Sequence, residues 1–571
     1  MEQEAVLAMY DVRGIQKFIF RTNKVKEIMG ASCLVEDIIG KALKFALEKE
    51  KALECSVISW EKKEDEDKEE LVFLSNKEIQ AQVLFIGGGN AYVLFRSRDL
   101  AVRVNKKMSR YILDHTYSLQ LAVAMVEKTD SYKKDYLNVQ NQMASNKAAM
   151  PFSGCLGGLP VVKMDDMTGY PISTDGKEKL RYKPEEGKMY CVESTLKLTS
   201  FYENVEKEGI EKKFENLITE YGKDSMIAVV HIDGNNMGMR IRDLMQDEED
   251  YGSAVKRMRT ISQNINRNFK DTYDKTAKHL REWVESDANQ VLRKGTKDKP
   301  AVYIRKIITA GDDITFVCNA KIALDIVNYF IQDISKKMMY EAKQEDDLEK
   351  YGLSVCAGIA FINYHFPFST AYQVAEACCD SAKSRAKEEH NREFARIGNW
   401  IDFQICRDVQ DTDFKRNREK NYRISGGEWL LRRPYYVDVK SNAYEKMNKK
   451  NTAYSFRHFD EIFQYMTKKI PSSLAKELRN TYPLGCDAVE RLTEFAQSRG
   501  YLLLDIGEDT ETKENAETKE DTEARENMKV SSGYIELDGC QTAAWYDAVE
   551  MMDLYVRTDS REEGEKADGQ N

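Results

Sequence analysis

The chain has 571 residues, of which 42% are hydrophobic and 32% charged, and its formal net charge is -10. This length exceeds what a single hydrophobic core supports, so we expect about three or four domains. The acidic balance excludes a protein that coats nucleic acid non-specifically, although it is compatible with a local basic groove.

The N-terminus and the cysteines bear on whether the protein is secreted, membrane-bound, disulfide-rich or zinc-binding. MEQEAVLAMYD lacks the basic start, apolar core and small-residue cleavage site of a signal peptide. No run of about 18 apolar residues occurs, so no membrane segment is expected and the predicted location is the cytoplasm. The eleven cysteines never form a C-x-x-C pair, which argues against a disulfide framework or a cysteine-rich zinc site.

Residues 1–126 are predicted to form a first domain of mixed α and β structure. A buried strand over residues 5–10 ends at Asp11, GIQKFIF turns into a helix, and a second helix is expected over residues 25–50. ECSVISW is a predicted strand, QVLFIGGGNAYVLF a hairpin around a glycine-rich tip, and SLQLAVAMVE a further strand.

Residues 223–400 are predicted to form a second domain. AVVHIDGNNMG ends an apolar strand at Asp233, and IRKIITAGDDITFVCNA places Asp312 and Asp313 at the tip of a hairpin. A charged helical insertion separates the two stretches. After the hairpin, the pattern predicts a helix, the strand LSVCAGIAFI and a long helix that carries two lysines one turn apart.

The first domain reads as a faint copy of the second. Asp11 and Asp233 end corresponding strands, and Asn90 and Asp313 occupy corresponding hairpin tips at nearly the same offset, which indicates a duplicated domain. The copy lacks two of the three carboxylates, so it should be structural or contribute only nucleotide contacts. A merely flexible turn at residues 87–89 would account for this region almost as well.

The other parts of the chain carry weaker signals. Residues 127–222 read as a connecting subdomain in which Cys155 and Cys191 would supply only half of a structural zinc set with no His between them, so no zinc is expected there. The remaining predicted parts are a helical C-terminal domain over 401–506 that begins within WIDFQICRDV, a disordered acidic linker over 507–531, and a short helix and tail over 532–571.

A basic and aromatic stretch lies inside the predicted helical domain. Charge combined with stacking surface suits single-stranded RNA or a partner protein, but an ordinary solvated face is the preferred interpretation. The residues concerned are Arg432, Arg433, Tyr435, Tyr436, Lys440, Tyr444, Lys446, Lys449 and Lys450.

The carboxylates of the second domain suit two-metal nucleotidyl transfer. Two Mg²⁺ or Mn²⁺ ions can activate an attacking sugar hydroxyl and neutralise the departing pyrophosphate. Such hard cations need only a few carboxylates besides the phosphates of the substrate, and Asp233, Asp312 and Asp313 would supply them. Taken singly, each of these motifs is usually plain turn chemistry, but their combination favours a site.

The loop after Asp233 and the long helix add groups suited to a triphosphate. Glycines leave the backbone open to close approach, and amide side chains can donate to and accept from a base or ribose. Lysines can meet the phosphates as point charges, although exposed helix lysines are more often only solvated. The predicted nucleotide-binding residues are Gly234, Asn235, Asn236, Gly238, Lys383 and Lys387.

Taken in order, GIQKFIF, VLFIGGGNAYVLF, VVHIDGNNMG, AGDDITFV and CAGIAFINYHFPFSTAYQVAEACCDSAKSRAK resemble the large polymerase-like subunit of type III CRISPR effector complexes. The resemblance implies an α+β protein with two ferredoxin-like palm domains, each an antiparallel sheet with helices on one face, plus a helical C-terminal domain. It implies that the second palm binds ATP and two divalent cations and makes cyclic oligoadenylate second messengers in antiviral defence. RNA and other effector subunits are the implied partners, and the oligomeric state stays open.

The family motifs can be matched residue by residue. Asp233 matches the first metal-binding Asp, and Gly311, Asp312 and Asp313 match the last three positions of the family's Gly-Gly-Asp-Asp hairpin. Ala310 stands where the family has its first glycine and adds a methyl group beside the expected triphosphate. Both Ala310 and Gly311 therefore count among the predicted nucleotide-binding positions.

Further matches and departures bear on the function. Asn236 matches a nucleotide-contacting Asn, and Lys383 and Lys387 fall in the family's trailing Ala-Lys helix. The chain opens directly with the first palm and has no His-Asp pair, so an HD-type nuclease is not expected. Alternatives to oligoadenylate synthesis are an inactive RNA or protein scaffold and a cyclase or dinucleotide synthase that uses GTP or mixed nucleotides. Retention of three mutually repelling acids favours an enzyme.

Overall fold

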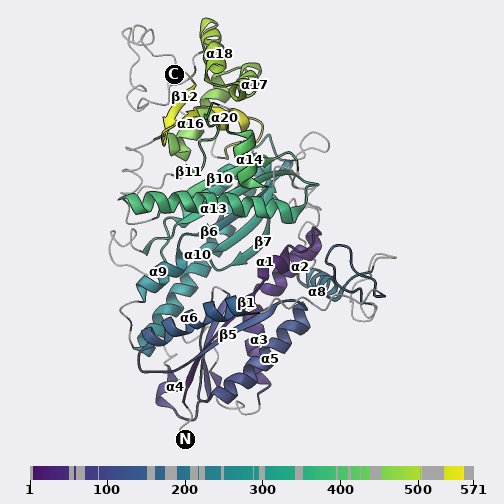
Figure 1. Cartoon of the computed structure of the whole chain (residues 1–571), viewed down its shortest axis with the longest axis vertical. Helices are drawn as coiled ribbons and strands as arrows, with labels where there is room; N and C mark the ends of the chain where they lie inside the picture. Colours follow the sequence, from purple (N-terminus) through teal and green to yellow (C-terminus); the bar gives the residue numbers. More distant parts are fainter. Residues whose placement is uncertain are drawn as a thin grey trace, which may run out of the picture.

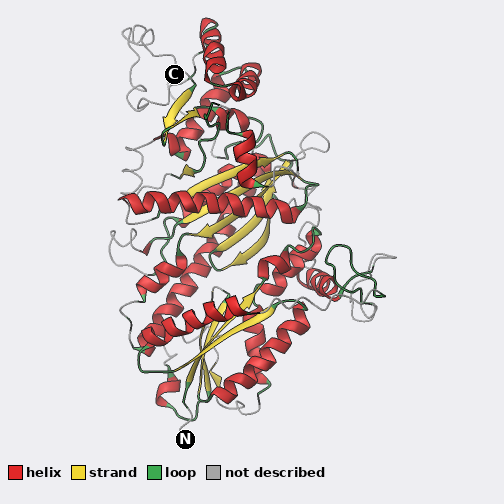
Figure 2. Cartoon of the chain, in the orientation of Figure 1, coloured by secondary structure: helices red, strands yellow, loops and turns green. Residues whose placement is uncertain are grey.

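The part of the chain that the structure describes forms two large sheets covered by helices, a two-stranded sheet, and a helical part beyond the second large sheet (Figure 1, Figure 2). This arrangement confirms the predicted α+β class. The computed structural model describes residues 4–50, 57–58, 71–87, 89–150, 161–173, 189–205, 217, 226–245, 248, 250–286, 288–294, 303–340, 351–393, 397–408, 413–424, 426–437, 452–501, 503 and 533–558.

The first sheet has the strand order β2-β3-β4-β1-β5. Its strands are β1 (Val6–Arg13), β2 (Val57–Ile58), β3 (Ala81–Gly87), β4 (Asn90–Phe95) and β5 (Gln120–Glu127). The helices of this region are α1 (Ile15–Ile19), α2 (Val25–Val35), α3 (Ile38–Glu48), α4 (Val72–Ser75), α5 (Arg98–Thr116) and α6 (Tyr132–Ala149). Helix α6 lies beyond the predicted boundary at residue 126, yet it packs against β1 and β5.

One helix prediction in this region was wrong. The single helix expected over residues 25–50 is two helices, α2 and α3, because Asp37 leaves the helical conformation with a φ of -139°. The small residues in α2 do permit a close approach, since a side chain at Gly30 would collide with the backbone of Lys197. Lys197 lies in α8 (Val192–Ser200), which continues as the π-helical turn η2 (Phe201–Val205).

The second sheet has the order β11-β10-β9-β6-β8-β7. Its strands are β6 (Met226–Gly234), β7 (Ile304–Ala310), β8 (Asp313–Asn319), β9 (Val355–Asn363), β10 (Trp400–Cys406) and β11 (Tyr435–Tyr436). Its helices are α9 (Met237–Leu244), α10 (Tyr251–Glu285), the short 3₁₀ turn η5 (Ala320–Ile322), α11 (Ala323–Ile334) and α13 (Phe368–Glu393), which runs across the sheet in Figure 1.

The two sheets repeat one arrangement of strands. In the first, β1 lies between β4 and β5, and β3 forms a hairpin with β4; in the second, β6 lies between β8 and β9, and β7 forms a hairpin with β8. All of these pairs are antiparallel. The duplication inferred from the sequence is therefore visible in the strand order.

The prediction that WIDFQICRDV opens a helical domain was wrong. Trp400–Cys406 is strand β10, which pairs in parallel with β9 and has every residue buried. A short apolar run cannot be assigned to helix or buried strand by periodicity alone. The second sheet therefore continues past residue 400.

The helices predicted after residue 450 are confirmed as α16 (Phe456–Lys469), α17 (Ser472–Thr481) and α18 (Cys486–Ser498). The short helix predicted within residues 532–571 was placed too broadly, because the stretch CQTAAWYDAVEMMDLYV is not one helix. It starts as β13 (Cys540–Ala543), paired with β12 (Tyr534–Leu537), and is helical only in α20 (Tyr546–Glu550). The remaining elements are α14 (Phe414–Asn421) and the 3₁₀ turns η7 (Thr452–Tyr454) and η8 (Tyr482–Leu484).

The first part of the basic and aromatic stretch is not a solvated face. Arg432, Arg433, Tyr435 and Tyr436 are buried. The guanidinium of Arg433 lies 3.1 Å from Asp547 and 2.8 Å from Glu550, so it anchors α20 to the segment that leads into β11. The other residues of the stretch, Lys440, Tyr444, Lys446, Lys449 and Lys450, lie outside the described residues.

Three further sequence predictions concern the connecting region, the linker and the membrane. Cys191 is buried, and its sulfur accepts a hydrogen bond from the backbone N–H of Ser194 at the start of α8, whereas Cys155 lies outside the described residues. The predicted linker, residues 507–531, also lies outside them. Within the described ranges, no helix combines the length and the apolarity needed to cross a bilayer.

The buried cluster around Arg433 gives a test of the C-terminal packing. Arg433→Ala would leave the carboxylates of Asp547 and Glu550 buried without their cation, so we expect the free energy of unfolding to fall by about 3–5 kcal/mol. Arg110→Ala removes an exposed pair with Asp114 and should change it little. Urea denaturation measures both variants, and equally small losses would contradict the anchoring role of Arg433.

Candidate active site

Strands β6 and β8 bring the predicted acids together at one end of the second sheet. Asp233, near the end of β6, pairs with Asp313, the first residue of β8. Side chains alternate between the two faces of a strand, so Asp233 and Asp313 lie on the same face as His231, which is two residues before Asp233. The apolar residues of β6 before these positions are buried and fix the register.

Asp312 lies in the tight turn between β7 and β8. Ala310 ends β7 opposite Asp313, and Gly311 adopts a φ of 64°, in the left-handed region that favours glycine. The backbone N–H of Gly234 donates to the carbonyl oxygen of Asp312 at 3.2 Å. A Cβ at Gly234 would lie 2.8 Å from Oδ2 of Asp312, so glycine is needed there for the two segments to meet.

The electrostatics at Asp312 reflect this crowding. Burial, followed by the neighbouring carboxylate of Asp233, raises the pKa of Asp312 from 3.8 to about 7. Asp313 adds to the rise, and the ammonium of Lys383 opposes it. The turn therefore holds an acid that a nearby cation would help to ionise.

Asp313 is directed toward His231 rather than toward Asp312. Its Oδ1 lies 3.3 Å from Nδ1 of the buried His231, which also lies 3.2 Å from Oγ1 of Thr315. Burial acts to lower the pKa of His231, but the hydrogen-bonding and charge interactions with Asp313 raise it overall. His231 was not predicted from the sequence, because its place within an apolar strand resembles that of an ordinary core residue.

Helix α13 delivers the predicted lysines. It packs closely on β9, because a Cβ at Gly358 would collide with the backbone of Ala375 and Cys379. Lys383 forms an ion pair with Asp233. Burial acts to lower the pKa of Lys383, but Cys379 and Asp233 raise it above its ordinary value. Lys387, one turn further along α13, is exposed and lines the same cavity.

The loop after Asp233 has two structural residues and one open position. Asn235 is 2% exposed, and its amide donates to the carbonyl oxygen of Gly398 at 2.9 Å, so it fastens the loop to the start of β10. Asn236 adopts the left-handed conformation before α9, with a φ of 50°. No atom lies within 4 Å of the position a Cβ would take at Gly238, which leaves free space beside the helix start.

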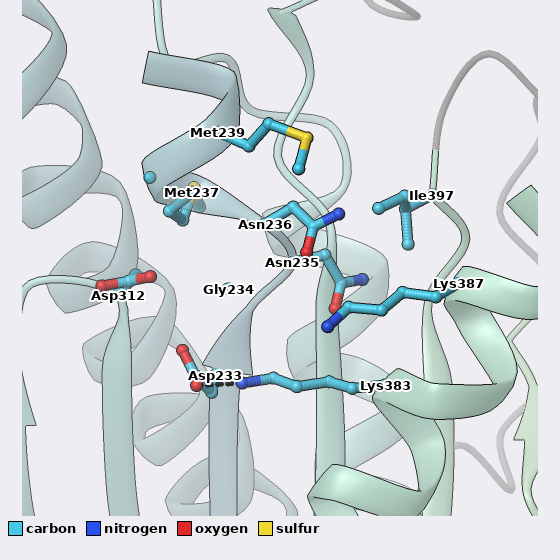
Figure 3. A pocket seen from close by; sticks show the side chains of 11 residues that line it. Asp233, Gly234, Asn235, Asn236, Met237, Met239, Asp312, Lys383, Lys387 and Ile397 are labelled. Carbon is cyan, nitrogen blue, oxygen red and sulfur yellow. Dashed lines mark hydrogen bonds and ion pairs between the residues drawn. The ribbon is translucent and has the colours of Figure 1, made fainter. Parts of the chain in front are cut away.

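These groups surround a cavity of about 310 Å³ (Figure 3). Figure 3 shows Asp233 and Asp312 on one side, with Lys383 and Lys387 reaching in from α13. Gly311 and Asp313 do not line it, whereas Met237, Met239 and Ile397 line it without having been predicted, since no motif marks apolar lining residues. The predicted residues that do line it are Asp233, Gly234, Asn235, Asn236, Gly238, Asp312, Lys383 and Lys387.

A second cavity, of about 460 Å³, adjoins the first and lies between the two sheets. The two cavities share Met237, Gly238 and Asp312, and Gly311 lines only the second. The first sheet contributes residues from the strand end, the hairpin tip and α6, namely Asp11, Gly87, Asn90 and Lys147. Asp11 forms an ion pair with Lys147, so its charge is compensated within the first domain.

The cavity residues are chemically suited to divalent cations. Asp233 and Asp312 offer carboxylate oxygens to one cavity, where burial and then the neighbouring carboxylate of Asp233 raise the pKa of Asp312. Hard ions such as Mg²⁺ take oxygen ligands and share them with water and phosphate. Within the described part of the chain, no three His, Cys, Asp or Glu side chains are grouped so that they could hold an ion unaided. Phosphate oxygens or water would therefore complete its coordination.

Comparison with known proteins finds a family that matches most of the second sheet and its helices. Residues 226–393 match the model of the Cas10/Cmr2 second palm domain, and no curated protein matches the chain. Similar solved structures include the Csm1-Csm4 subcomplex of the type III-A CRISPR-Csm interference complex, with 13% identity, a TM-score of 0.48, and coverage of 96% of this chain and 70% of that one.

Two structures of the Csm1-Csm4 cassette are also similar, one in complex with one ATP and one in complex with cA4. Each is 13% identical to this chain, with a TM-score of 0.46. Each alignment covers 97% of this chain and 70% of the matched chain. The family match includes β6 with Asp233, the hairpin with Asp312 and Asp313, and the lysines of α13. Residues 226–393 therefore form a Cas10-like second palm domain, as their motifs predict.

Proposed function

We propose that this chain joins ATP into cyclic oligoadenylates by a two-metal mechanism, in a type III CRISPR-like defence system with RNA and other effector subunits as partners. The observation that carries the proposal is the position of Asp312 between two adjoining cavities. Polymerisation needs two nucleotides side by side, and one in each cavity would meet beside this carboxylate. The choice of adenine rests on the family resemblance alone.

The chain's own residues have distinct roles in this proposal. The hydroxyl oxygen of one nucleotide attacks the α-phosphate of the other, and pyrophosphate leaves; bound cations would supply charge neutralisation and lower the pKa of the hydroxyl. Asp233, Asp312 and Asp313 would hold them. Lys383 would exchange its contact with Asp233 for a phosphate, and the free space beside Gly238 would admit the triphosphate.

A scaffold without activity is the second candidate, and one observation favours it. The ammonium of Lys383 forms an ion pair with Asp233, and Asp313 is directed toward His231. The three acids therefore do not converge on one point. In a scaffold this arrangement would persist when nucleotide and cations are added. In an enzyme, this arrangement of Lys383 and the three acids must change when nucleotide and cations bind.

Turnover of labelled nucleotide distinguishes the candidates. With radiolabelled ATP and Mg²⁺ or Mn²⁺, with and without RNA, we expect a cyclic product that Asp233→Asn and Asp312→Asn each reduce at least about 100-fold, because each removes charge that would hold the cations. GTP and mixed nucleotides in parallel reactions test the cyclase and dinucleotide alternatives.

Asp380→Asn serves as the matched control for that experiment. It removes an exposed carboxylate from α13 outside both cavities and should leave turnover unchanged. Equal product from the wild type and the Asp312 variant would remove the assigned site. No product under any condition would favour the scaffold.

The raised pKa of Asp312 predicts how stability depends on pH without divalent cations. A carboxyl whose pKa rises to about 7 on folding binds its proton more tightly in the folded state, so its ionisation destabilises the fold. This cost is absent below the ordinary pKa of 3.8, grows as the pH rises and is complete above about 7. Asp312→Asn should therefore stabilise the protein at about pH 8 but not at about pH 4.

Urea denaturation in EDTA at the two pH values measures this difference. Asp380→Asn controls for the loss of an exposed negative charge. A stabilisation of Asp312→Asn that is the same at both pH values would mean that Asp312 is not the titrating group.

A further inference from the structure

The GIQKFIF segment of the first palm docks on α13 of the second palm. Phe20 stacks on the ring of Tyr372, with 3.9 Å between centroids and 22° between planes. The amide of Gln16 donates to the hydroxyl of Tyr372 at 3.2 Å and to Glu376 at 2.8 Å. Just beyond the segment, Asn23 accepts hydrogen bonds from Ser369 at the start of α13.

Tyr372 connects this docking site to the interior of the second palm. Its side chain is almost fully buried, with 2% exposed. Its ring meets the ring of His231 edge to face, with 5.5 Å between centroids and 73° between planes. The first palm therefore reaches His231 through one aromatic side chain.

His231 in turn supports Asp313. Its Nδ1 lies within 3.3 Å of both Oδ1 of Asp313 and Oγ1 of Thr315. Oδ1 of Asp313 is buried, and Nδ1 of His231 is the polar group that faces it at 3.3 Å. On the face of the sheet that carries Asp233 and Asp313, the buried side chains of His231 and Tyr372 therefore pack next to Asp313 and next to each other.

We propose that His231 is a positioning residue for Asp313, and that docking of GIQKFIF through Phe20 and Tyr372 holds His231 in place. The proposal rests on the proposed function, since it assumes that Asp313 binds a divalent cation. Groups that orient a metal ligand from behind affect metal affinity strongly when removed. The first palm, although it lacks the paired acids, then also supports the site of the second palm through its contact with α13.

Binding of Mn²⁺ tests this directly and does not require turnover. Electron paramagnetic resonance of free Mn²⁺, with a non-hydrolysable ATP analogue present, gives the half-saturating Mn²⁺ concentration. His231→Phe keeps a ring against Tyr372 but removes Nδ1, so we expect this concentration to rise about tenfold, and His231→Asn, whose amide can replace Nδ1, should recover part of the loss. Phe20→Ala should raise it about threefold, because it acts one contact further away.

Phe45→Ala is the matched control. Phe45 is a half-buried ring that pairs with Tyr111 inside the first palm, away from α13, and its removal should leave Mn²⁺ binding unchanged. Wild-type affinity in both His231→Phe and Phe20→Ala would overturn the positioning role while leaving the cation site intact. Equal losses in Phe45→Ala and Phe20→Ala would also overturn it, since the effect would then be general. Absence of Mn²⁺ binding by the wild type would remove the proposed function itself.

Discussion

Repulsion among carboxylates at one edge of the second sheet is the constraint on which the site depends. The pairing of β6 with β8 sets Asp233 opposite Asp313, and the turn before β8 adds Asp312. Like charges this close oppose their own ionisation, and burial followed by the carboxylate of Asp233 raises the pKa of Asp312. The apolar strands are buried on both faces of the sheet, and they hold the register against this repulsion because a slip by one residue would exchange the side chains that pack into the two cores.

In the first palm, the corresponding acidic position has its charge balanced by a lysine. In each palm a strand-end acid meets a lysine from the helix after the fourth strand of the repeat: Asp11 meets Lys147, and Asp233 meets Lys383. The first palm has Asn90 at the hairpin tip, so one lysine compensates one acid. The second palm retains two further acids and therefore an excess of negative charge. That difference explains why the proposed cation site lies in the second palm, with the first palm lining the adjoining cavity.

Much of this arrangement could be predicted from the sequence. Val- and Ile-rich runs that stop at Asp233 and Asp313 identify strands and a hairpin, and their repetition around Asp11 and Asn90 indicates the duplicated sheet. These are local patterns with clear periods. Strand β10 could not be told from a helix, because its residues are buried on both faces and carry no alternation.

Other features depend on contacts that no local pattern encodes. Asn235 appeared suited to a nucleotide, but its amide is bound to Gly398, far along the chain. Arg433 and Tyr435 appeared to form a basic, stacking surface, but acids in α20, more than a hundred residues later, draw them into the interior. The support of Asp313 by His231, Tyr372 and Phe20 joins three distant segments in the same way.

A crystal structure of the protein with Mn²⁺ and a non-hydrolysable ATP analogue would be the most direct measurement, because anomalous scattering locates the manganese independently of activity. The two-metal site predicts manganese peaks beside Asp233 and Asp312, the triphosphate beside Gly238, and Lys383 moved from Asp233 to a phosphate. Manganese or nucleotide found only elsewhere, with Lys383 still bound to Asp233, would contradict it.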